Sequence, residues 1–300
     1  MAEKKADGFL NILKPPGMSS HDVIGAVRKV LKMKRVGHAG TLDPAAAGVL
    51  PIATGQAARL IEYLELADKT YRAELTFGLA TDSGDDTGEV TESVTDFTMP
   101  SKEEVMAALQ KFTGIIRQTP PAHSAIKING KRACDLLRQG VAVEIPSREV
   151  TIHAIDLIAY KPEEKKILID VKCSKGTYIR SLCLDIGAAL GLPAVMSFLV
   201  RSRVGDFSLT EALTLEELQE RGAETILPPA EFLNHLERYD LDPSREKAFC
   251  NGLGTGERRH VPKSDTLRVY CAGDFLGIGR YDRKTQEVIP AKVILRQAGH

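Results

Sequence analysis

The chain has 300 residues, of which 43% are hydrophobic and 27% are charged, and its formal net charge is zero. This composition is typical of a folded globular protein with one large domain or a large and a small one, and the neutral balance counts against a nucleic-acid partner bound by charge alone. No apolar run is long enough to cross a bilayer, the first residues lack the apolar core of a secretory signal, and the five scattered cysteines include no Cys-x-x-Cys pair. We therefore expect a cytoplasmic protein with no membrane partner, no zinc site and no disulfide framework.

The charges are unevenly distributed along the sequence. Basic residues outnumber acidic ones before Gly40, and a second basic group lies between Arg117 and Arg148. Acidic residues concentrate in residues 82–92 and 211–220. Such asymmetry can give a neutral protein one positive face, although a charge run is more often only a solvated surface.

The N-terminal segment predicts a strand followed by a basic helix. Residues 8–13 (GFLNIL) read as a short strand that ends before Pro15. Ser19 or Ser20 can cap the helix that follows, in which apolar residues recur at helical spacing. The opposite face of this helix is basic and carries Arg28, Lys29, Lys32 and Lys34. Because the helix leads directly into the next loop, we expect it to bring positive charge next to that loop.

That loop, residues 37–44 (GHAGTLDP), is the first candidate for chemistry. Its glycines let the backbone wrap closely around a ligand, and Asp43 precedes Pro44, which biases it toward an extended or turn conformation. A carboxylate on a tight loop is a candidate catalytic group. Asp-Pro is also an ordinary turn pair, so these residues alone leave a purely structural role open.

The next segment predicts a helix and then a strand. Residues 55–66 have a helical pattern. Residues 69–77 alternate as a strand does. One face of that strand is expected to carry Tyr71, Ala73, Leu75 and Phe77.

Three features follow before the middle of the chain. Residues 81–89 are acidic but lack the spacing of a calcium-binding loop, so they predict a turn between strands. Ser101 and Glu104 form a capping box that opens a helix. Residues from about 117 to 147 are basic and irregular, and we interpret them as an insertion that projects from the main body.

Two candidate site residues lie in residues 176–181 (GTYIRS). Tyr178 and Arg180 are two apart, so in an extended segment both would point to the same face. An aromatic ring beside a guanidinium suits a flat charged ligand, or a carboxylate with a base stacked above it. If the two segments meet, Arg180 is the nearby group that would keep Asp43 ionised.

The second half of the chain alternates strands and short helices. Strands are expected over residues 150–160, 167–173 and 194–208, and helices over residues 182–190 and 214–221. Breaks near residues 227–229 and 241–243 precede a β-rich module with strands near 267–271, 275–281 and 287–289. The glycines at 252–256 predict a turn, because no βαβ unit surrounds them.

Four separated stretches together resemble the bacterial TruB-type tRNA pseudouridine synthases: residues 11–20 (NILKPPGMSS), 37–44 (GHAGTLDP), 69–72 (KTYR) and 176–180 (GTYIR). The resemblance implies an α+β pseudouridine synthase fold, with a central mixed, largely antiparallel sheet flanked by helices. It also implies that the insertion at about 117–147 is a basic, thumb-like RNA-binding element. We expect a catalytic domain over residues 1–236 and a small, β-rich, PUA-like RNA-binding domain over residues 237–300.

The same resemblance implies the chemistry. Such enzymes convert uridine 55 in the tRNA T-loop to pseudouridine by detaching the uracil, turning it and rejoining it through carbon 5. Asp43 matches the nucleophile, and Arg180 matches the arginine paired with it. Tyr71 matches the tyrosine that stacks on the base, Tyr178 lines the pocket, and His38 matches the histidine that fills the gap left by the flipped-out base. No metal or cofactor is expected, because isomerisation moves no net electrons and the carboxylate supplies the covalent handle.

The expected partner is tRNA, bound through its T-arm. The candidate RNA-binding residues are Lys14, Lys127, Lys131 and Arg132, which would contact phosphates. Guide-RNA-dependent relatives largely lack the insertion, so we expect a stand-alone enzyme without a guide RNA, and a monomer. Two departures from the family are the three alanines at 45–47 and Cys134, which stands where the family has a tyrosine.

Two other hypotheses stay open. One is an RNA-binding folding helper that unfolds and releases tRNA, which is compatible with the isomerase. The other is a small-molecule hydrolase with an aspartate nucleophile, for which the basic insertion has no purpose and the flanking histidine motif is missing.

Overall fold

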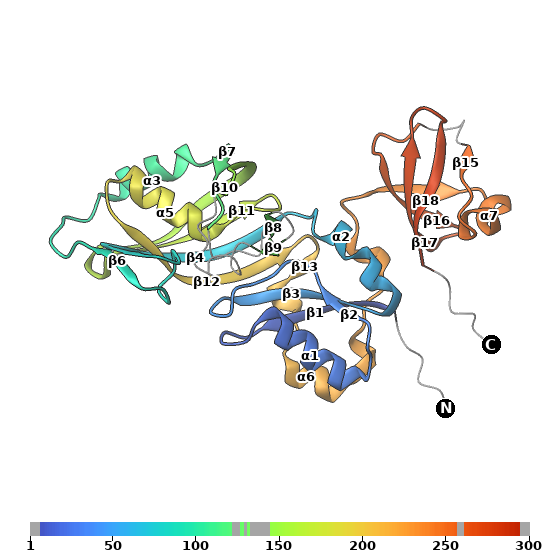
Figure 1. Ribbon diagram of the computed structural model, residues 1–300, viewed down its shortest axis with the longest axis horizontal. Helices are drawn as coiled ribbons and strands as arrows, with labels where there is room; N and C mark the ends of the chain where they lie inside the picture. Colours follow the sequence, from blue (N-terminus) through green and yellow to red (C-terminus); the bar gives the residue numbers. More distant parts are fainter. Residues whose placement is uncertain (1–6, 122–126, 129–130, 133–144, 257–260, 295–300) are drawn as a thin grey trace.

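The computed structural model of the chain describes residues 7–121, 127–128, 131–132, 145–256 and 261–294. These residues form two bodies, each built on a β-sheet, and the smaller body lies at one end of an elongated molecule (Figure 1). In this part of the chain no helix is long and apolar enough to span a membrane.

The larger body is built on a mixed sheet. Its strands are β1 (Gly8–Lys14), β2 (Val36–His38), β3 (Ala47–Thr54), β4 (Lys69–Phe77), β7 (Gly114–Gln118), β10 (Arg148–Lys161), β11 (Lys166–Cys173), β12 (Ala194–Val204) and β13 (Phe207–Ser208). The main path runs β1-β3-β12-β4-β11-β10-β7, with β2 paired to β3 and β13 to β12. Among the described strands of this sheet only β12 and β3 pair in parallel, so the predicted mixed, largely antiparallel sheet is confirmed.

Helices cover this sheet at both ends. They are α1 (Ser20–Leu31), α2 (Ile61–Leu64), α3 (Lys102–Lys111), α5 (Ile179–Ala189) and α6 (Leu215–Arg221). Ser19 caps α1 through a capping box with Asp22, and Ser101 caps α3 in the same way with Glu104. The predicted helix over residues 55–66 is split, since residues Gly55–Leu60 form a 3₁₀ helix that runs into α2.

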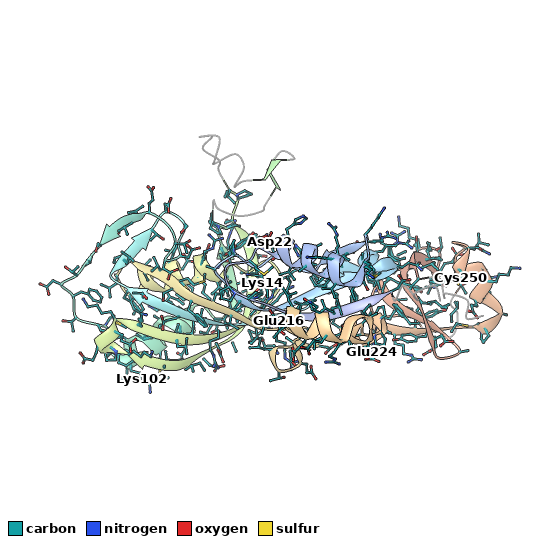
Figure 2. All side chains as sticks on the ribbon, turned by 90° about the horizontal axis from the view of Figure 1, so that it is seen from below. Lys14, Asp22, Lys102, Glu216, Glu224 and Cys250 are labelled. Atoms are coloured by element: carbon teal, nitrogen blue, oxygen red, sulfur yellow. The ribbon has the colours of Figure 1, made fainter. Side chains whose placement is uncertain are left out.

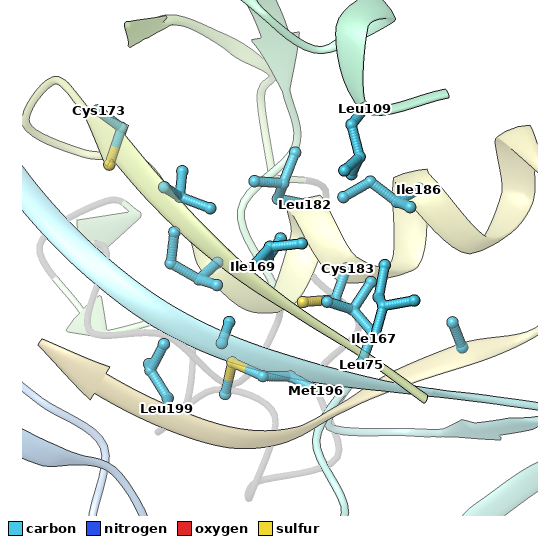
Figure 3. Close-up of a cluster of buried hydrophobic side chains, with 14 of the residues drawn as sticks. Leu75, Leu109, Ile167, Ile169, Cys173, Leu182, Cys183, Ile186, Met196 and Leu199 are labelled. Carbon is cyan, nitrogen blue, oxygen red and sulfur yellow. The ribbon is translucent and has the colours of Figure 1, made fainter. Parts of the chain in front are cut away.

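The main core lies between α5 and the centre of the sheet (Figure 3). Leu182, Cys183 and Ile186 point from α5 onto Leu75 of β4 and Ile169 of β11, and all five are fully buried. Burial of each large side chain contributes roughly 1.5–3 kcal/mol, so this contact fixes α5 on the sheet. The predicted inward face of β4 is confirmed, with Tyr71 at its half-buried end.

The β1–β3 end of the sheet is buried on both faces. Phe9 of β1 packs on one face, beneath the 55–60 helix and α2. Leu10 and Ile12 point the other way, against α1 and α6. Because strand side chains alternate between faces, a strand buried on both faces has a mainly apolar sequence, as in residues 8–13, where Asn11 is the one polar residue.

Two hairpins lie outside the main sheet of this body. The acidic segment forms the predicted turn, between β5 (Leu79–Thr81) and β6 (Val90–Ser93). In the insertion, β8 (Lys127–Ile128) pairs with β9 (Lys131–Arg132). Cys134 lies outside the described residues.

The smaller body carries the last sheet. Its strands are β14 (Glu237–Leu241), β15 (Thr255–Gly256), β16 (Thr266–Cys271), β17 (Asp274–Asp282) and β18 (Glu287–Val293), in the order β14-β16-β17-β18-β15, with α7 (Glu246–Cys250) beside β18. The predicted β-rich module is confirmed. It is joined to the larger body by polar contacts, including Arg59 Nη1 to the Val293 carbonyl at 2.9 Å and Lys292 to Glu62 at 3.0 Å.

Candidate active site

Asp43 lies on the loop between β2 and β3, and its neighbours fix the backbone on both sides. Ser20, buried at the start of α1, accepts from the Leu42 N–H at 2.9 Å and donates to the Leu42 carbonyl at 3.1 Å. The Gly17 N–H donates to the Pro44 carbonyl at 2.8 Å. Gly40 has a φ of +85°, a conformation that other residues rarely adopt. The loop that carries Asp43 is therefore held by the turn that precedes α1.

Lys14 supports the same loop from inside the protein (Figure 2). Its ammonium donates to the carbonyls of Pro15, Met18 and Pro44, at 2.9, 2.5 and 3.1 Å. Burial lowers the pKa of Lys14, while the charge of Asp43 acts to raise it. The expectation that Lys14 contacts a tRNA phosphate is wrong, because the fold buries this side chain completely and uses its three N–H donors.

Arg180 is the partner of Asp43. Its Nε lies 3.1 Å from Asp43 Oδ2, and only 6% of the Arg180 side chain is exposed, against 39% for Asp43. The meeting that the sequence left open therefore occurs in the structure. The guanidinium is enclosed, whereas the carboxylate stays open to a ligand.

A second carboxylate, that of Asp85, faces Arg180 from the opposite side. Asp85 Oδ2 lies 3.8 Å from Arg180 Nη1, which also donates to the Ser83 carbonyl at 2.9 Å. Burial opposes the ionised form of Asp85, but hydrogen bonds from Thr87 and Ser83, together with the Arg180 charge, hold its pKa below the ordinary value. Asp85 is thus a fixed anion that orients Arg180.

Sequence reasoning missed Asp85. It stands in the acidic turn of residues 81–89, where Asp82 and Asp86 look like it and are exposed. Asp85 differs from these two residues because its part of the turn packs against β12. The neighbouring Asp86 N–H donates to the Met196 carbonyl of β12 at 3.2 Å. No signal in the sequence predicts that contact.

Tyr71 and His38 lie near the same loop. Burial raises the pKa of Tyr71, and the charge of Arg201 of β12 opposes that shift. The charge of Asp43 also acts to raise the pKa of Tyr71. Burial, aided by the charges of Arg201 and His21, lowers the pKa of His38, so its imidazole is neutral at pH 7.

Tyr178 does not share a face with Arg180, and this prediction is wrong. The extended segment ends at Tyr178, which is the N-cap of α5, so Arg180 already belongs to the helix. The Tyr178 ring lies 5.0 Å beneath the guanidinium of Arg148. Gln118 accepts from the Tyr178 N–H at 2.8 Å and donates to its carbonyl at 2.9 Å. Tyr178 is therefore fixed by Gln118 and Arg148, which flank the insertion.

Of the three alanines behind Asp43, Ala46 is buried, Ala47 is half-buried and Ala45 is exposed. Ala46 is buried with Leu42 in the main core, against Ala73 of β4. Ala47 begins β3 and pairs with Val200 of β12. The small side chain of Ala46 lets the loop pack directly on the sheet.

The arrangement offers a reachable carboxylate with a buried cation beside it. Such a group can attack an electrophilic carbon or stabilise a positive charge that develops there. Among the described residues, no group of three or more His, Cys, Asp or Glu side chains could hold a metal ion.

Comparison with known proteins shows which family the chain belongs to. Residues 28–179 match the N-terminal domain of the TruB family of pseudouridylate synthases, and residues 180–235 match the tRNA pseudouridylate synthase B C-terminal domain. The chain belongs to the TruB family. Family membership confirms the predicted enzyme class, a pseudouridine synthase of the tRNA type and hence an isomerase.

Relatives that match over most of their length support the assignment to the TruB family. The chain is 46% identical over 280 residues to tRNA pseudouridine synthase B of Alkaliphilus oremlandii, covering 91% of this chain and 92% of that protein. It is 43% identical over 305 residues to the protein of the same name from Heliobacterium modesticaldum, covering 99% and 98%.

Solved structures confirm the TruB-like fold. A chain in the crystal structure of a Cbf5–Nop10–Gar1 complex superposes with a TM-score of 0.74 at 25% identity, covering 96% of this chain and 84% of that one. A chain in an H/ACA RNP bound to a substrate RNA gives a TM-score of 0.71 at 23% identity, covering 97% and 86%.

The geometry around Arg180 predicts the effect of Asp85→Asn. This change keeps the size of the side chain but removes the second anion, so Arg180 is held less firmly against Asp43. We expect pseudouridine formation under single-turnover conditions to fall roughly 10- to 100-fold, as for the loss of a charged hydrogen-bond partner. The exposed neighbour supplies the control, because Asp86→Asn should leave the rate unchanged. Equal rates for both variants would show that Asp85 does not act on Arg180.

Proposed function

We propose that the enzyme converts uridine 55 in the T-loop of tRNA to pseudouridine, with Asp43 as the nucleophile and without a cofactor. One observation carries the proposal: the Asp43 carboxylate is partly exposed, while its partner Arg180 is buried 3.1 Å away. A buried arginine cannot give up its charge, and its planar N–H groups fix the direction of the carboxylate. The free face of Asp43 is then directed at whatever enters the site.

A uridine inside folded RNA must leave its stack before its glycosidic bond can be reached. In our proposal the uracil stacks on Tyr71 and contacts Tyr178. Neutral His38 occupies the gap that the base leaves, since an uncharged ring is suited to stacking among bases. Asp43 forms the covalent intermediate, and the detached uracil is rejoined through carbon 5.

The tRNA substrate is supported by the full-length relatives, which are named tRNA pseudouridine synthase B. Lys127, Lys131 and Arg132 belong to one hairpin of the insertion, β8–β9, which pairs Lys127 with Arg132. We propose that this hairpin grips the phosphates of the T-arm. We also propose the division into a catalytic domain, residues 1–236, and a PUA-like RNA-binding domain, residues 237–300.

The strong likeness to these relatives, against 25% identity to the chain of the Cbf5–Nop10–Gar1 complex, favours an enzyme that acts without a guide RNA. We propose a monomer that works in the cytoplasm.

Asp43→Asn tests the nucleophile. The amide cannot form the covalent intermediate, so pseudouridine in a T-arm stem-loop should fall by at least about a thousandfold, or ~4 kcal/mol. Binding of the stem-loop, measured by filter retention, should stay within a few-fold of wild type because the fold around Asp43 is kept. Full activity in the variant would rule out the nucleophile. If the variant still promotes folding of unmodified tRNA, the folding-helper activity exists beside the isomerase.

Replacement of Lys127, Lys131 and Arg132 by Ala tests the insertion. Each lost phosphate contact lowers the dependence of log affinity on log salt by about 0.7 to 0.9, so the triple variant should bind the T-arm more weakly and with a flatter slope. Exposed lysines elsewhere supply the control, and Lys102, Lys161 and Lys172 replaced by Ala should preserve the slope. An unchanged slope in the insertion variant would mean that the hairpin does not bind phosphates.

A further inference from the structure

Arg201 is a buried cation next to the active site. It lies on β12, only 1% of it is exposed, and among the described residues it takes part in no ion pair. A buried charge without a counter-ion costs several kcal/mol unless hydrogen bonds compensate it. A guanidinium has N–H donors and no acceptor, so the surroundings of Arg201 must provide acceptors.

The acceptors of Arg201 come from two parts of the site. Arg201 Nη2 donates to the Gly40 carbonyl at 2.9 Å, on the loop that leads to Asp43, and Nε donates to the Val49 carbonyl at 2.8 Å. Tyr71 pairs with Arg201 across β4 and β12, so the two side chains lie next to each other on one face of the sheet. One side chain thus binds the nucleophile loop and lies beside the tyrosine.

The backbone brings Arg201 to this place. Arg201 pairs with Tyr71 of β4 on one side and with Gly48 of β3 on the other. Gly48 has a φ of +115°, and a Cβ there would lie 2.2 Å from the Arg201 carbonyl oxygen. Only glycine permits this approach, so the parallel pairing of β3 and β12 is what sets the guanidinium between the loop and Tyr71.

We propose that Arg201 is a positioning residue that acts on the reaction through Tyr71. In this proposal the guanidinium donates to the phenolic oxygen and fixes the ring, and because a guanidinium cannot accept a hydrogen bond, the phenolic proton stays free for another acceptor. The contact with Gly40 ties this tyrosine to the loop of Asp43, so the stacking group and the nucleophile are aligned by one side chain. This inference rests on the proposed contact of Tyr71 with the base.

A double-mutant cycle tests the coupling. Arg201→Lys keeps the buried charge, but one ammonium cannot reach Tyr71, Gly40 and Val49 as the planar guanidinium does. We expect the single-turnover rate to fall roughly 10- to 100-fold, with T-arm affinity unchanged. In the Tyr71→Phe background the same change should cost less than about threefold, because the shared interaction is already lost.

Other outcomes overturn the inference. Rate losses that multiply in the double variant would mean that Arg201 acts independently of Tyr71, and a fully active Tyr71→Phe variant would leave nothing to act through. Arg203→Lys, the same change at an exposed site on β12, is the matched control and should keep the wild-type rate. Failure of the proposed function is read separately, from wild-type enzyme that forms no pseudouridine.

A measurement without turnover covers the case in which Arg201→Lys does not fold. Tyr71→Phe removes one hydroxyl and should shift the guanidinium ¹⁵N resonances of Arg201, which is otherwise untouched. Unchanged resonances would show that the contact does not exist in solution and would overturn the inference.

Discussion

The ion pair of Arg180 with Asp43 is the interaction on which the rest of the site depends. Burying a guanidinium is costly, and a buried charge that loses its partner costs roughly 3–5 kcal/mol. In this fold the charge of Arg180 is compensated by Asp43 on one side and by Asp85 and the Ser83 carbonyl on the other. Three segments far apart in the chain must therefore meet for Arg180 to be accommodated: the nucleophile loop, the acidic turn after β5 and the start of α5. The same requirement that assembles the site also directs the open carboxylate of Asp43.

The sheet provides the frame for that meeting. The packing of α5 on β4 and β11 fixes Arg180 (Figure 3). The single parallel contact among the described strands of the large sheet, β3 with β12, sets where the loop of Asp43 ends. Two buried cations hold this loop from within. Lys14 binds the Pro44 carbonyl behind Asp43, and Arg201 binds the Gly40 carbonyl ahead of it. Both act on backbone carbonyls, which a change of loop side chains would leave in place.

Much of the fold could be predicted from local patterns, because capping boxes, strand alternation and glycine turns each depend on residues that are close in the sequence. Asp43 and Arg180 were identified from their motifs. Whether the two side chains meet depends on the fold, and only the structure shows it. Asp85 could not be found, since its role depends on a turn docking onto β12. Lys14 was wrongly predicted to contact RNA, because no local sequence pattern indicates that a lysine is buried against three carbonyls. Tyr178 was misjudged because α5 begins earlier than its apolar pattern suggests. Arg201 lies in a strand without a distinctive motif. Its contacts near the site depend on the order of the strands in the sheet.

The central claim is that Arg180 acts by fixing the direction of the Asp43 carboxylate, beyond supplying positive charge. The most direct test is the single-turnover rate of pseudouridine formation by Arg180→Lys at saturating T-arm RNA. Lysine keeps the charge but cannot reach Asp43, Asp85 and the Ser83 carbonyl together. The account predicts a loss of at least about a hundredfold while RNA affinity stays within a few-fold of wild type. A variant that works at the wild-type rate would show that charge alone suffices, and would contradict the account.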